Sequence, residues 1–299
     1  MPARRARVGY LGPAGTFTEE ALLASAEGDG LAPVALAGIY ETVLALREGE
    51  LEWAIVPIEN SLEGSISVTL DLLAERDSGV EIVGEALLRV RHSLIAPAPV
   101  ALADIDTVIT HPQVPGQCVA FLRGELAHAR ILAASSTAEA VRGVVAEGRR
   151  GQAALGTQLA AEIYGGTVIR SGVEDRDDNE TRFVWLAREG GGAPPLRARD
   201  RAEAAPWKTS LVFWGPGAER PGWLVRCLDE FAQRDINLTK IESRPRRERM
   251  GSYMFFLDLA GHAEVAPVAA AIAGLGRQCE EVRVLGSYRA GARPGRAGA

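Results

Sequence analysis

The stretch that decides the fold is EDRDDNETRFVWLAR, residues 174–188. Its second half, from Phe183 to Ala187, is a compact apolar run rich in aromatic and β-branched residues, which is typical of a buried strand. Its first half is charged and polar, and it predicts a loop. Thr181 and Arg182 therefore stand at the mouth of a strand, where parallel sheets present residues to a ligand.

Length and composition limit the class of protein. The chain has 299 residues, enough for two or three domains, and 47% hydrophobic and 24% charged residues predict a soluble globular protein. Its 33 basic and 39 acidic residues give a net charge of −6, which disfavours nucleic-acid and membrane partners. We find no secretory core and no apolar run of the ~20 residues that a membrane helix needs, so we expect a cytoplasmic protein.

The cysteines and histidines do not indicate a metal site. Cys118, Cys227 and Cys279 are far apart and form no CxxC pair, so we expect reduced thiols rather than disulfides or zinc ligands. The four histidines lack the spacing of metal ligands.

Strand-like and helix-like segments alternate through the first 187 residues, which predicts parallel sheets covered by helices. Residues 188–206 combine glycine, proline and charge without periodicity, and they predict a mobile linker. The later segments follow the order β-α-β-β-α-β, which predicts a separate ferredoxin-like domain. Within it, SYMFFLDLA (252–260) has two largely apolar faces, so we expect burial on both sides, as between the subunits of a homodimer or homotetramer.

Polar groups follow several of the predicted strands. GYLGPAGTFTEEAL (9–22) has three glycines between a strand and a helix, and it leaves backbone N–H groups, Thr16 and Thr18 to meet an anion. A tight structural turn is an equal alternative for this segment. THPQVPGQC (110–118) offers Thr110 and Gln117, either of which could instead be a helix cap.

VPIENSLEGS (56–65) is the more specific of these segments. Glu59, Asn60 and Ser61 come directly after an apolar strand, which puts them in the crevice region of an α/β sheet. Capping of the next helix is an alternative role for Asn60 or Ser61.

Seven segments together resemble one family. GYLGPAGTFTEEAL, VPIENSLEGSI, HSLI, THPQVPGQC, SSTAEAV, AALGTQLAAEIYG and NETRFVWLAR occur in the order and spacing of prephenate dehydratase, and KIESRP resembles its ACT-type regulatory domain. The resemblance implies an α/β catalytic domain at 1–187, a linker at 188–206, an ACT domain at 207–289 and a flexible tail at 290–299. It also implies two lobes like those of a periplasmic binding protein, with lobe one at about 1–88 and 168–187 and lobe two at about 89–167.

The resemblance implies a reaction, the loss of carbon dioxide and water from prephenate to give phenylpyruvate on the path to L-phenylalanine. No metal or other cofactor is expected, because formation of the aromatic ring supplies the driving force. Two alternatives stay open at this point. One is the same chemistry on the aminated analogue, arogenate, and the other is a non-catalytic two-lobed sensor of amino or keto acids.

The family pattern also assigns roles to residues. It places Thr181 beside the leaving hydroxyl, where a hydrogen bond that strengthens as the C–O bond breaks would aid departure. Glu59 is a rival proton source if burial keeps it protonated. The implied catalytic set is Thr181, Glu59, Asn60 and Gln117, and the implied substrate-binding set is Thr18, Ser61, Thr110 and Arg182. A salt bridge from Arg182 to the acidic run before it is an alternative, because neighbours on a strand face opposite ways.

The C-terminal segments imply an effector site. ESRP (242–245) resembles the motif with which ACT domains of this family bind phenylalanine at a subunit interface, and PGWLVRCL (221–228) occupies the place of the accompanying Gly-Ala-Leu segment. We expect an amino-acid effector, L-Phe, with binding residues Gly222, Trp223, Leu224, Glu242, Ser243, Arg244 and Pro245. Alternatively, Trp223 anchors the domain core together with Cys227 and Phe231.

Overall fold

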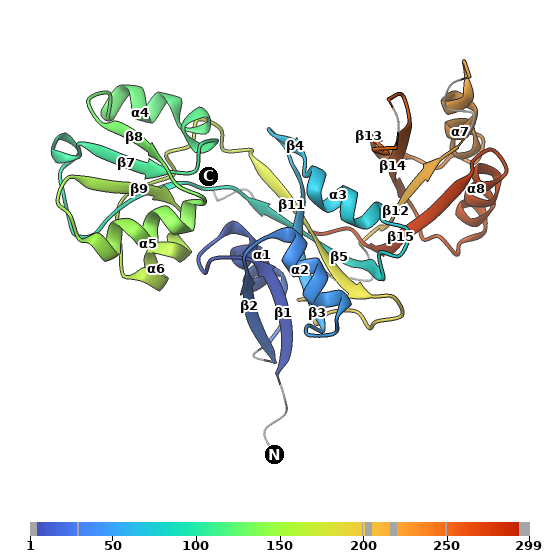
Figure 1. Ribbon diagram of the computed structural model, residues 1–299, viewed down its shortest axis with the longest axis horizontal. Helices are drawn as coiled ribbons and strands as arrows, with labels where there is room; N and C mark the ends of the chain where they lie inside the picture. Colours follow the sequence, from blue (N-terminus) through green and yellow to red (C-terminus); the bar gives the residue numbers. More distant parts are fainter. Residues whose placement is uncertain are drawn as a thin grey trace.

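The computed structural model describes residues 5–28, 30–198, 200, 205–215, 220–248 and 250–292. Three bodies, each built on one sheet, follow one another along the longest axis (Figure 1). Lobe one lies in the middle, with lobe two on one side and the C-terminal domain on the other.

Lobe one is a sheet with the strand order β2-β1-β3-β11-β5. Its strands are β1 (Ala6–Leu11), β2 (Leu31–Leu36), β3 (Trp53–Asn60), β5 (Val80–Arg89) and β11 (Glu180–Arg188), and the short β4 (Gly64–Ser65) pairs with β3. β1 runs parallel to β2 and β3, whereas β11 runs antiparallel to both β3 and β5. The predicted parallel sheet is therefore a mixed one.

Helices cover both faces of this sheet. Helix α1 (Phe17–Ser25) packs on one face, in a core cluster that includes Leu22 and Trp185. Helices α2 (Ile39–Arg47) and α3 (Ser67–Ala74) pack on the other face, in a cluster that includes Val184. The apolar run that follows Arg182 is thus buried on both sides, which is the environment that its composition predicts.

Lobe two has the strand order β10-β6-β9-β7-β8. Its elements are β6 (Ser93–Ala96), β7 (Thr107–Thr110), α4 (Val119–Glu125), β8 (Arg130–Ala133), α5 (Thr137–Glu147), β9 (Gln152–Gly156), α6 (Gln158–Tyr164) and β10 (Thr167–Ser171), with 3-10 turns η1 (Leu102–Asp104) and η2 (Val114–Gln117). Because β10 pairs with β6, lobe two extends to Ser171, and the predicted return to lobe one near residue 167 is too early.

The C-terminal domain has the element order predicted from the sequence. Strand β12 (Trp207–Trp214) is followed by α7 (Trp223–Ala232), β13 (Leu238–Pro245), β14 (Tyr253–Ala260), α8 (Ala266–Gly276) and β15 (Glu281–Arg289). The sheet order is β13-β14-β12-β15, and both helices pack on one face. Trp223 is only 4% exposed and lies in that core with Cys227 and Phe231, as the core-anchor alternative predicts.

The other face of this sheet docks on lobe one. Met254 and Phe256 of β14 belong to the same core cluster as Val184 and Leu186 of β11. Gly286 of β15 passes so close to the backbone of Ile82 that a side chain there would overlap it. Apart from the exposed Tyr253, both apolar faces of segment 252–260 are therefore covered within one chain, and the expected separate domain shares a core with lobe one.

The second half of the connecting segment packs against lobe one, whereas residues 188–193 are exposed. Leu196 is buried and forms a bridge with Ala26, and the Arg197 Nε donates to the Ala26 carbonyl. At the other end of the domain, the Ala290 and Gly291 N–H groups bond to Pro206 and Glu85, while the predicted tail from residue 293 onward lies outside the described residues.

The two lobes meet where the glycine turn of lobe one contacts α6. The Thr157 hydroxyl donates to the Gly15 carbonyl at 2.6 Å, and the Tyr164 hydroxyl donates to the Ala14 carbonyl at 2.8 Å. Gly15 has φ +85°, and a Cβ there would overlap the backbone of Ala160. The turn therefore needs a glycine for lobe contact.

One carboxylate pair at this contact is sensitive to pH. Burial raises the pKa of Glu20 on α1 from 4.5 to about 7, and the neighbouring Glu162 of α6 adds to the rise. The folded state binds the Glu20 proton more tightly than the unfolded state does. The contribution of the protonated carboxyl to folding stability is therefore present at low pH and is lost as pH rises through about 7.

We predict that Glu20→Gln raises the melting temperature, relative to the unmodified chain, more at pH 8 than at pH 5. At pH 8 the Glu20 carboxylate is ionised and its burial destabilises the folded state, and the substitution removes this charge. At pH 5 the side chain is already neutral in the folded state, so the substitution changes little. Calorimetry at both pH values measures the difference. Glu48→Gln, at an exposed glutamate, is the control and should shift both melting temperatures alike; equal shifts for Glu20→Gln would contradict the prediction.

Candidate active site

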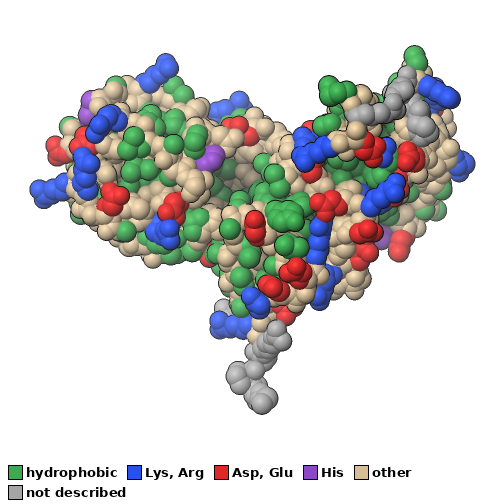
Figure 2. Space-filling model, in the orientation of Figure 1, with side chains coloured by type: hydrophobic (Ala, Val, Ile, Leu, Met, Phe, Trp, Pro, Cys, Tyr) green, Lys and Arg blue, Asp and Glu red, His purple; other side chains and the backbone are tan. Residues whose placement is uncertain are grey.

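A pocket of about 320 Å³ lies between the two lobes, and the space-filling view shows a hollow there (Figure 2). Both lobes line it: β3, β11 and the start of α1 contribute from lobe one, and His92 just before β6, η2 and the start of α5 contribute from lobe two. Among the described residues, no lysine or arginine lines this pocket. The lining is apolar, hydroxyl, amide and imidazole in character, with one carboxylate, Glu63.

Thr181 is held beside Asn60 by strand pairing. The two residues are register partners because β11 enters antiparallel to β3, so the start of β11 lies beside the end of β3. The Asn60 Nδ2 donates to the Thr181 Oγ1 at 2.9 Å, while the Asn60 Oδ1 accepts from the N–H groups of Leu62 and Glu63. These bonds fix the amide, whose nitrogen must face the threonine.

This arrangement leaves the Thr181 proton available. A hydroxyl carries one O–H donor and two acceptor lone pairs, and Asn60 occupies an acceptor position. Among the described residues, the hydroxyl donates to no protein acceptor. The O–H is therefore free to donate to a group bound in the cleft.

Asn179 extends the polar network across the cleft. Its Oδ1 accepts from Asn60 at 2.9 Å, and its Nδ2 donates to the Gln117 Oε1 at 3.1 Å. Gln117 belongs to lobe two and its Nε2 also donates to Glu63 at 3.4 Å. A chain of hydrogen bonds therefore links Gln117 of lobe two, through Asn179, to Asn60, which bonds to Thr181.

His92 is a pocket residue that sequence reasoning treated as ordinary. Its Nε2 lies 3.1 Å from the Gln117 Oε1, which can only accept, so Nε2 carries the proton. Its Nδ1 is buried without a hydrogen-bond partner in the described part of the chain. Burial lowers the pKa of His92, and the bond to Gln117 opposes this only in part, so the ring is neutral near pH 7.

Two helices begin at the pocket, one from each lobe. Thr16 caps α1 and Ser136 caps α5, each by accepting a hydrogen bond from the glutamate N–H three residues later. Thr18 is buried and lines the pocket in the first turn of α1. The first-turn N–H groups have no intrahelical partner, so both helix starts present partial positive charge to the cleft.

Part of the expected anion site in the glycine turn is already occupied. The Gly15 N–H donates to the Glu19 carboxylate at 2.5 Å, and the Thr16 hydroxyl donates to the Leu11 carbonyl. The prediction that this turn leaves backbone N–H groups, Thr16 and Thr18 to meet an anion is therefore wrong for the Gly15 N–H and for the Thr16 hydroxyl.

Four of the eight predicted catalytic and substrate-binding residues line the pocket: Thr181, Asn60, Gln117 and Thr18. Thr110 does not, because its hydroxyl is buried in lobe two and donates to the Leu155 carbonyl. Ser61 does not either, because it points to the rim and bonds to Asn179 and the Glu180 N–H.

Glu59 and Arg182 lie on the opposite face of the sheet from Thr181. Residues that alternate along a strand face opposite ways, and Glu59 and Arg182 are themselves register partners. Glu59 is 3.0 Å from Lys240 and 3.4 Å from Arg182. Neither side chain reaches the pocket, so the predictions of Glu59 as an acid and Arg182 as a substrate ligand are wrong. The alternative partner for Arg182, the acidic run before it, is also wrong.

The predicted effector residues lie at one end of the C-terminal sheet. Trp223 contacts Phe255, whose register partner is Ser243, so the two motifs approach each other through that ring. Glu242 accepts from Ser65, and Arg244 pairs with Asp71 of α3, so both face lobe one. Gly222, Leu224, Ser243 and Pro245 remain accessible.

Among the residues that sequence reasoning missed, His92 and Ser136 line the pocket, and Asn179 bonds to Asn60 and Gln117. His92, Asn179 and Ser136 all stand where a strand begins or ends at the cleft. The same strand-end reasoning that selected Asn60 could have found Ser136, and the two-residue spacing of Asn179 and Thr181 places them on one face. Nothing in the sequence marks His92 as buried beside Gln117.

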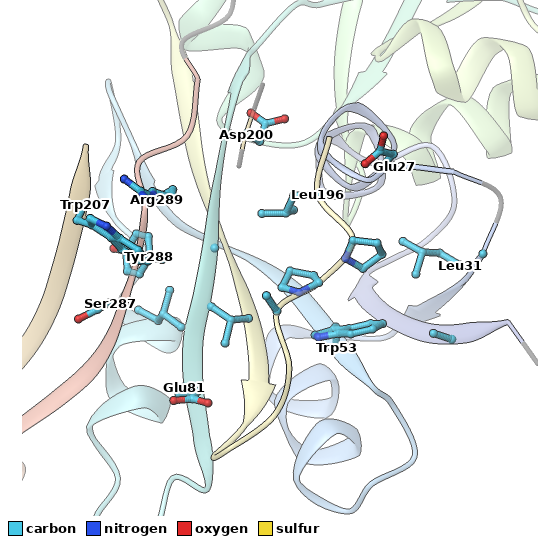
Figure 3. Close-up of a pocket in the computed structure, with 18 residues that line it drawn as sticks. Glu27, Leu31, Trp53, Glu81, Leu196, Asp200, Trp207, Ser287, Tyr288 and Arg289 are labelled. Atoms are coloured by element: carbon cyan, nitrogen blue, oxygen red, sulfur yellow. The ribbon is translucent and has the colours of Figure 1, made fainter. Parts of the chain in front are cut away.

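A second groove of about 660 Å³ lies between lobe one, the connecting segment and β15 (Figure 3). Its labelled charged side chains, Glu27, Glu81, Asp200 and Arg289, lie at separate edges and do not converge on one point. In the described ranges, no cluster of three or more His, Cys, Asp or Glu side chains is placed to hold a metal ion. No helix there has the length and apolar character to cross a membrane.

Comparison with known proteins identifies the family. A sequence model of the family described as Prephenate dehydratase matches residues 8–191. The chain belongs to the prephenate dehydratase family. A prephenate dehydratase from Mycolicibacterium vanbaalenii is 38% identical over 297 residues, which cover 95% of this chain and 91% of that protein. Prephenate dehydratases are lyases, so the chain is an enzyme of that class.

Solved structures share the whole arrangement. Prephenate dehydratase from Arthrobacter aurescens, determined in complex with L-Phe, has 35% identity and a TM-score of 0.83 over 95% of this chain and 89% of that one. A protein described as a quorum quenching acylase, GqqA, has 29% identity and a TM-score of 0.82 over 95% of this chain and 98% of that one. Because GqqA is named for another reaction, the fold alone does not assign the chemistry of this chain. The chemistry has to be argued from the residues of the site.

Proposed function

We propose that the chain converts prephenate to phenylpyruvate, with loss of carbon dioxide and water, in the cleft between the two lobes. The observation that carries the proposal is the Thr181 hydroxyl, which accepts from Asn60 and keeps its own proton for a ligand. Family membership supports the substrate. The chemistry needs one proton for the departing hydroxide, while the electrons of the breaking C–C bond complete the aromatic ring.

The charge distribution of the pocket suits this substrate. Prephenate carries two carboxylates, and the pocket offers two helix starts and several neutral donors instead of cations. A lysine or arginine at the ring carboxylate would stabilise the ground state more than the transition state, in which that charge disperses toward neutral carbon dioxide. Neutral donors bind the dianion without opposing decarboxylation as strongly.

In this mechanism Thr181 donates to the leaving hydroxyl. The hydrogen bond strengthens as negative charge develops on the departing oxygen, so it lowers the barrier more than it tightens binding. Asn60 and Gln117 act by orienting the hydroxyl, and Thr18 and the Ser136 end of α5 contact the carboxylates.

We predict that Thr181→Val lowers kcat by about 10²-fold or more, with a smaller change in KM, because it keeps the shape and deletes a donor used in the transition state. Initial rates of phenylpyruvate formation measure the effect. Thr181→Ser, which restores a hydroxyl, is the control and should recover much of kcat. A valine variant that keeps most of its kcat would contradict the role of Thr181.

The C-terminal domain is proposed to be an ACT-type regulatory domain that binds L-Phe. Its β-α-β-β-α-β order and the accessible residues of the two motifs support this, and the similar Arthrobacter enzyme was determined with L-Phe. We also propose a homodimer or homotetramer, supported by the exposed apolar side chains of Val225, Ile241 and Tyr253 on this domain.

One assay tests the reaction and its regulation. We expect ultraviolet-detected phenylpyruvate from prephenate, a lower kcat/KM for the aminated analogue arogenate, and a rate that changes when L-Phe is added. Absence of phenylpyruvate would reject the reaction, a preference for arogenate would reassign the substrate, and an unchanged rate with bound L-Phe would reject regulation. Sedimentation with and without L-Phe gives the oligomeric state.

A further inference from the structure

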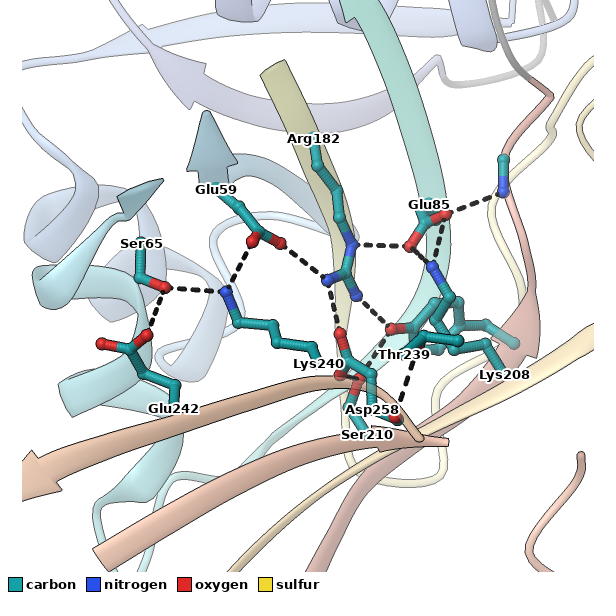
Figure 4. A network of polar contacts seen from close by, with 12 residues as sticks. Glu59, Ser65, Glu85, Arg182, Lys208, Ser210, Thr239, Lys240, Glu242 and Asp258 are labelled. Carbon is teal, nitrogen blue, oxygen red and sulfur yellow. Dashed lines mark hydrogen bonds and ion pairs between the residues drawn. The ribbon is translucent and has the colours of Figure 1, made fainter. Parts of the chain in front are cut away.

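A buried ionic network joins lobe one to the C-terminal domain directly behind Thr181 (Figure 4). Arg182 is at its centre. The Arg182 Nε donates to Glu85 of β5 at 2.6 Å, its Nη1 donates to Asp258 of β14 at 2.5 Å, and its Nη2 donates to the Tyr288 hydroxyl of β15 at 2.7 Å. One guanidinium therefore bonds to both bodies.

Arg182 and Asp258 are held in their charged states. Burial would lower the pKa of Arg182, but Tyr288, Asp258 and Glu85 raise it well above its ordinary value. Burial would likewise raise the pKa of Asp258, yet Arg182 and the Ser210 hydroxyl hold it below its ordinary value. Arg182 and Asp258 are 8% and 5% exposed, so little water screens the pair.

A second connection runs parallel to the first. Glu59 precedes Asn60 on β3, just as Arg182 follows Thr181 on β11. The Glu59 carboxylate is 3.0 Å from Lys240 of β13 and 3.4 Å from Arg182. Thr181 and Asn60 bond to each other on the cleft side of the sheet. Their sequence neighbours, Arg182 and Glu59, bond to the C-terminal domain on the other side of the sheet.

Backbone pairing holds the start of β11 less regularly on the β3 side than on the β5 side. The ladder between β11 and β3 shifts register between Arg182 and Phe183, whereas the ladder between β11 and β5 is unbroken from Glu180 to Trp185. An irregularity of this kind loosens the constraint that a continuous ladder places on the strand end. The ion pair between Arg182 and Glu59 adds a side-chain restraint on the β3 side, next to the Asn60–Thr181 hydrogen bond.

We propose that Arg182 is a positioning residue, which holds the Thr181 hydroxyl in its catalytic orientation only while the C-terminal domain is docked. The proposal rests on the proposed role of Thr181. It makes the contacts of Asp258 and Tyr288 with Arg182 the physical link between the state of the C-terminal domain and the chemistry of the cleft.

The test compares two isosteric Asp→Asn variants of the enzyme. Each is made in two backgrounds, the otherwise unmodified chain and the Thr181→Val variant. Asp258→Asn turns an acceptor for Arg182 into a neutral amide. Asp71→Asn is the matched control, because Asp71 also accepts from an arginine of the C-terminal domain, Arg244, but does not touch Arg182. For each protein, kcat and KM with prephenate are measured without effector, and calorimetry checks folding.

We expect Asp258→Asn to lower kcat between about 10-fold and 100-fold with KM within about twofold, since small displacements of a catalytic group have effects of this size. In the Thr181→Val background the same change should lower kcat by less than about twofold, because the hydroxyl through which it acts is absent. Asp71→Asn should leave kcat unchanged in both backgrounds.

Two results would overturn the proposal: a normal kcat for Asp258→Asn, or an equal loss in the presence and absence of the Thr181 hydroxyl. If Asp258→Asn does not fold, Tyr288→Phe replaces it, because it keeps the ring and deletes one bond to Arg182; a normal kcat for this variant then overturns the proposal. Full activity of Thr181→Val itself would instead reject the proposed function of Thr181, and the two failures are thus distinguishable.

Discussion

The insertion of β11 between β3 and β5 is the interaction on which the rest of the molecule depends. The chain returns from lobe two through β11, which completes the sheet of lobe one. The strand therefore connects the two lobes covalently. It also separates two environments, because successive side chains leave a strand on opposite faces. Thr181 faces the cleft, whereas Arg182 faces the C-terminal domain.

This separation explains where the charged groups are. Arg182, Lys208 and Lys240 lie behind the sheet and are paired with carboxylates, and the cleft in front is lined by neutral donors, helix starts and one carboxylate, Glu63. Cations in front would hold a dianion more tightly but would oppose the loss of a carboxylate. The fold therefore keeps Arg182 next to Thr181, the proposed catalytic residue, without exposing the arginine charge to the cleft.

The sequence predicted the order of the elements and four of the residues that line the pocket between the lobes. Asn60, Gln117 and Thr18 were found because polar residues after strands meet at one edge of a sheet. Glu59, Arg182 and Thr110 were misplaced because their faces depend on register and on partners distant in the chain, such as Asp258, 76 residues after Arg182. The packed connecting segment was missed for the same reason, since its glycines and prolines do not reveal that Leu196 fills a hydrophobic core.

A buried network of this kind is not explained by stability. Desolvation of buried charges offsets most of their attraction, and well-packed apolar residues of the same volume often do as well or better, whereas loss of one partner costs about 3–5 kcal/mol. An apolar contact, however, tolerates small sliding motions, because dispersion is not directional. A guanidinium bonded at once to Glu85, Asp258 and Tyr288 admits a single relative position of two sheets. The Thr181 side chain, one residue before Arg182, needs the same orientation in every docked molecule. Directional hydrogen bonds of the ionic network can provide this, and a purely hydrophobic interface cannot.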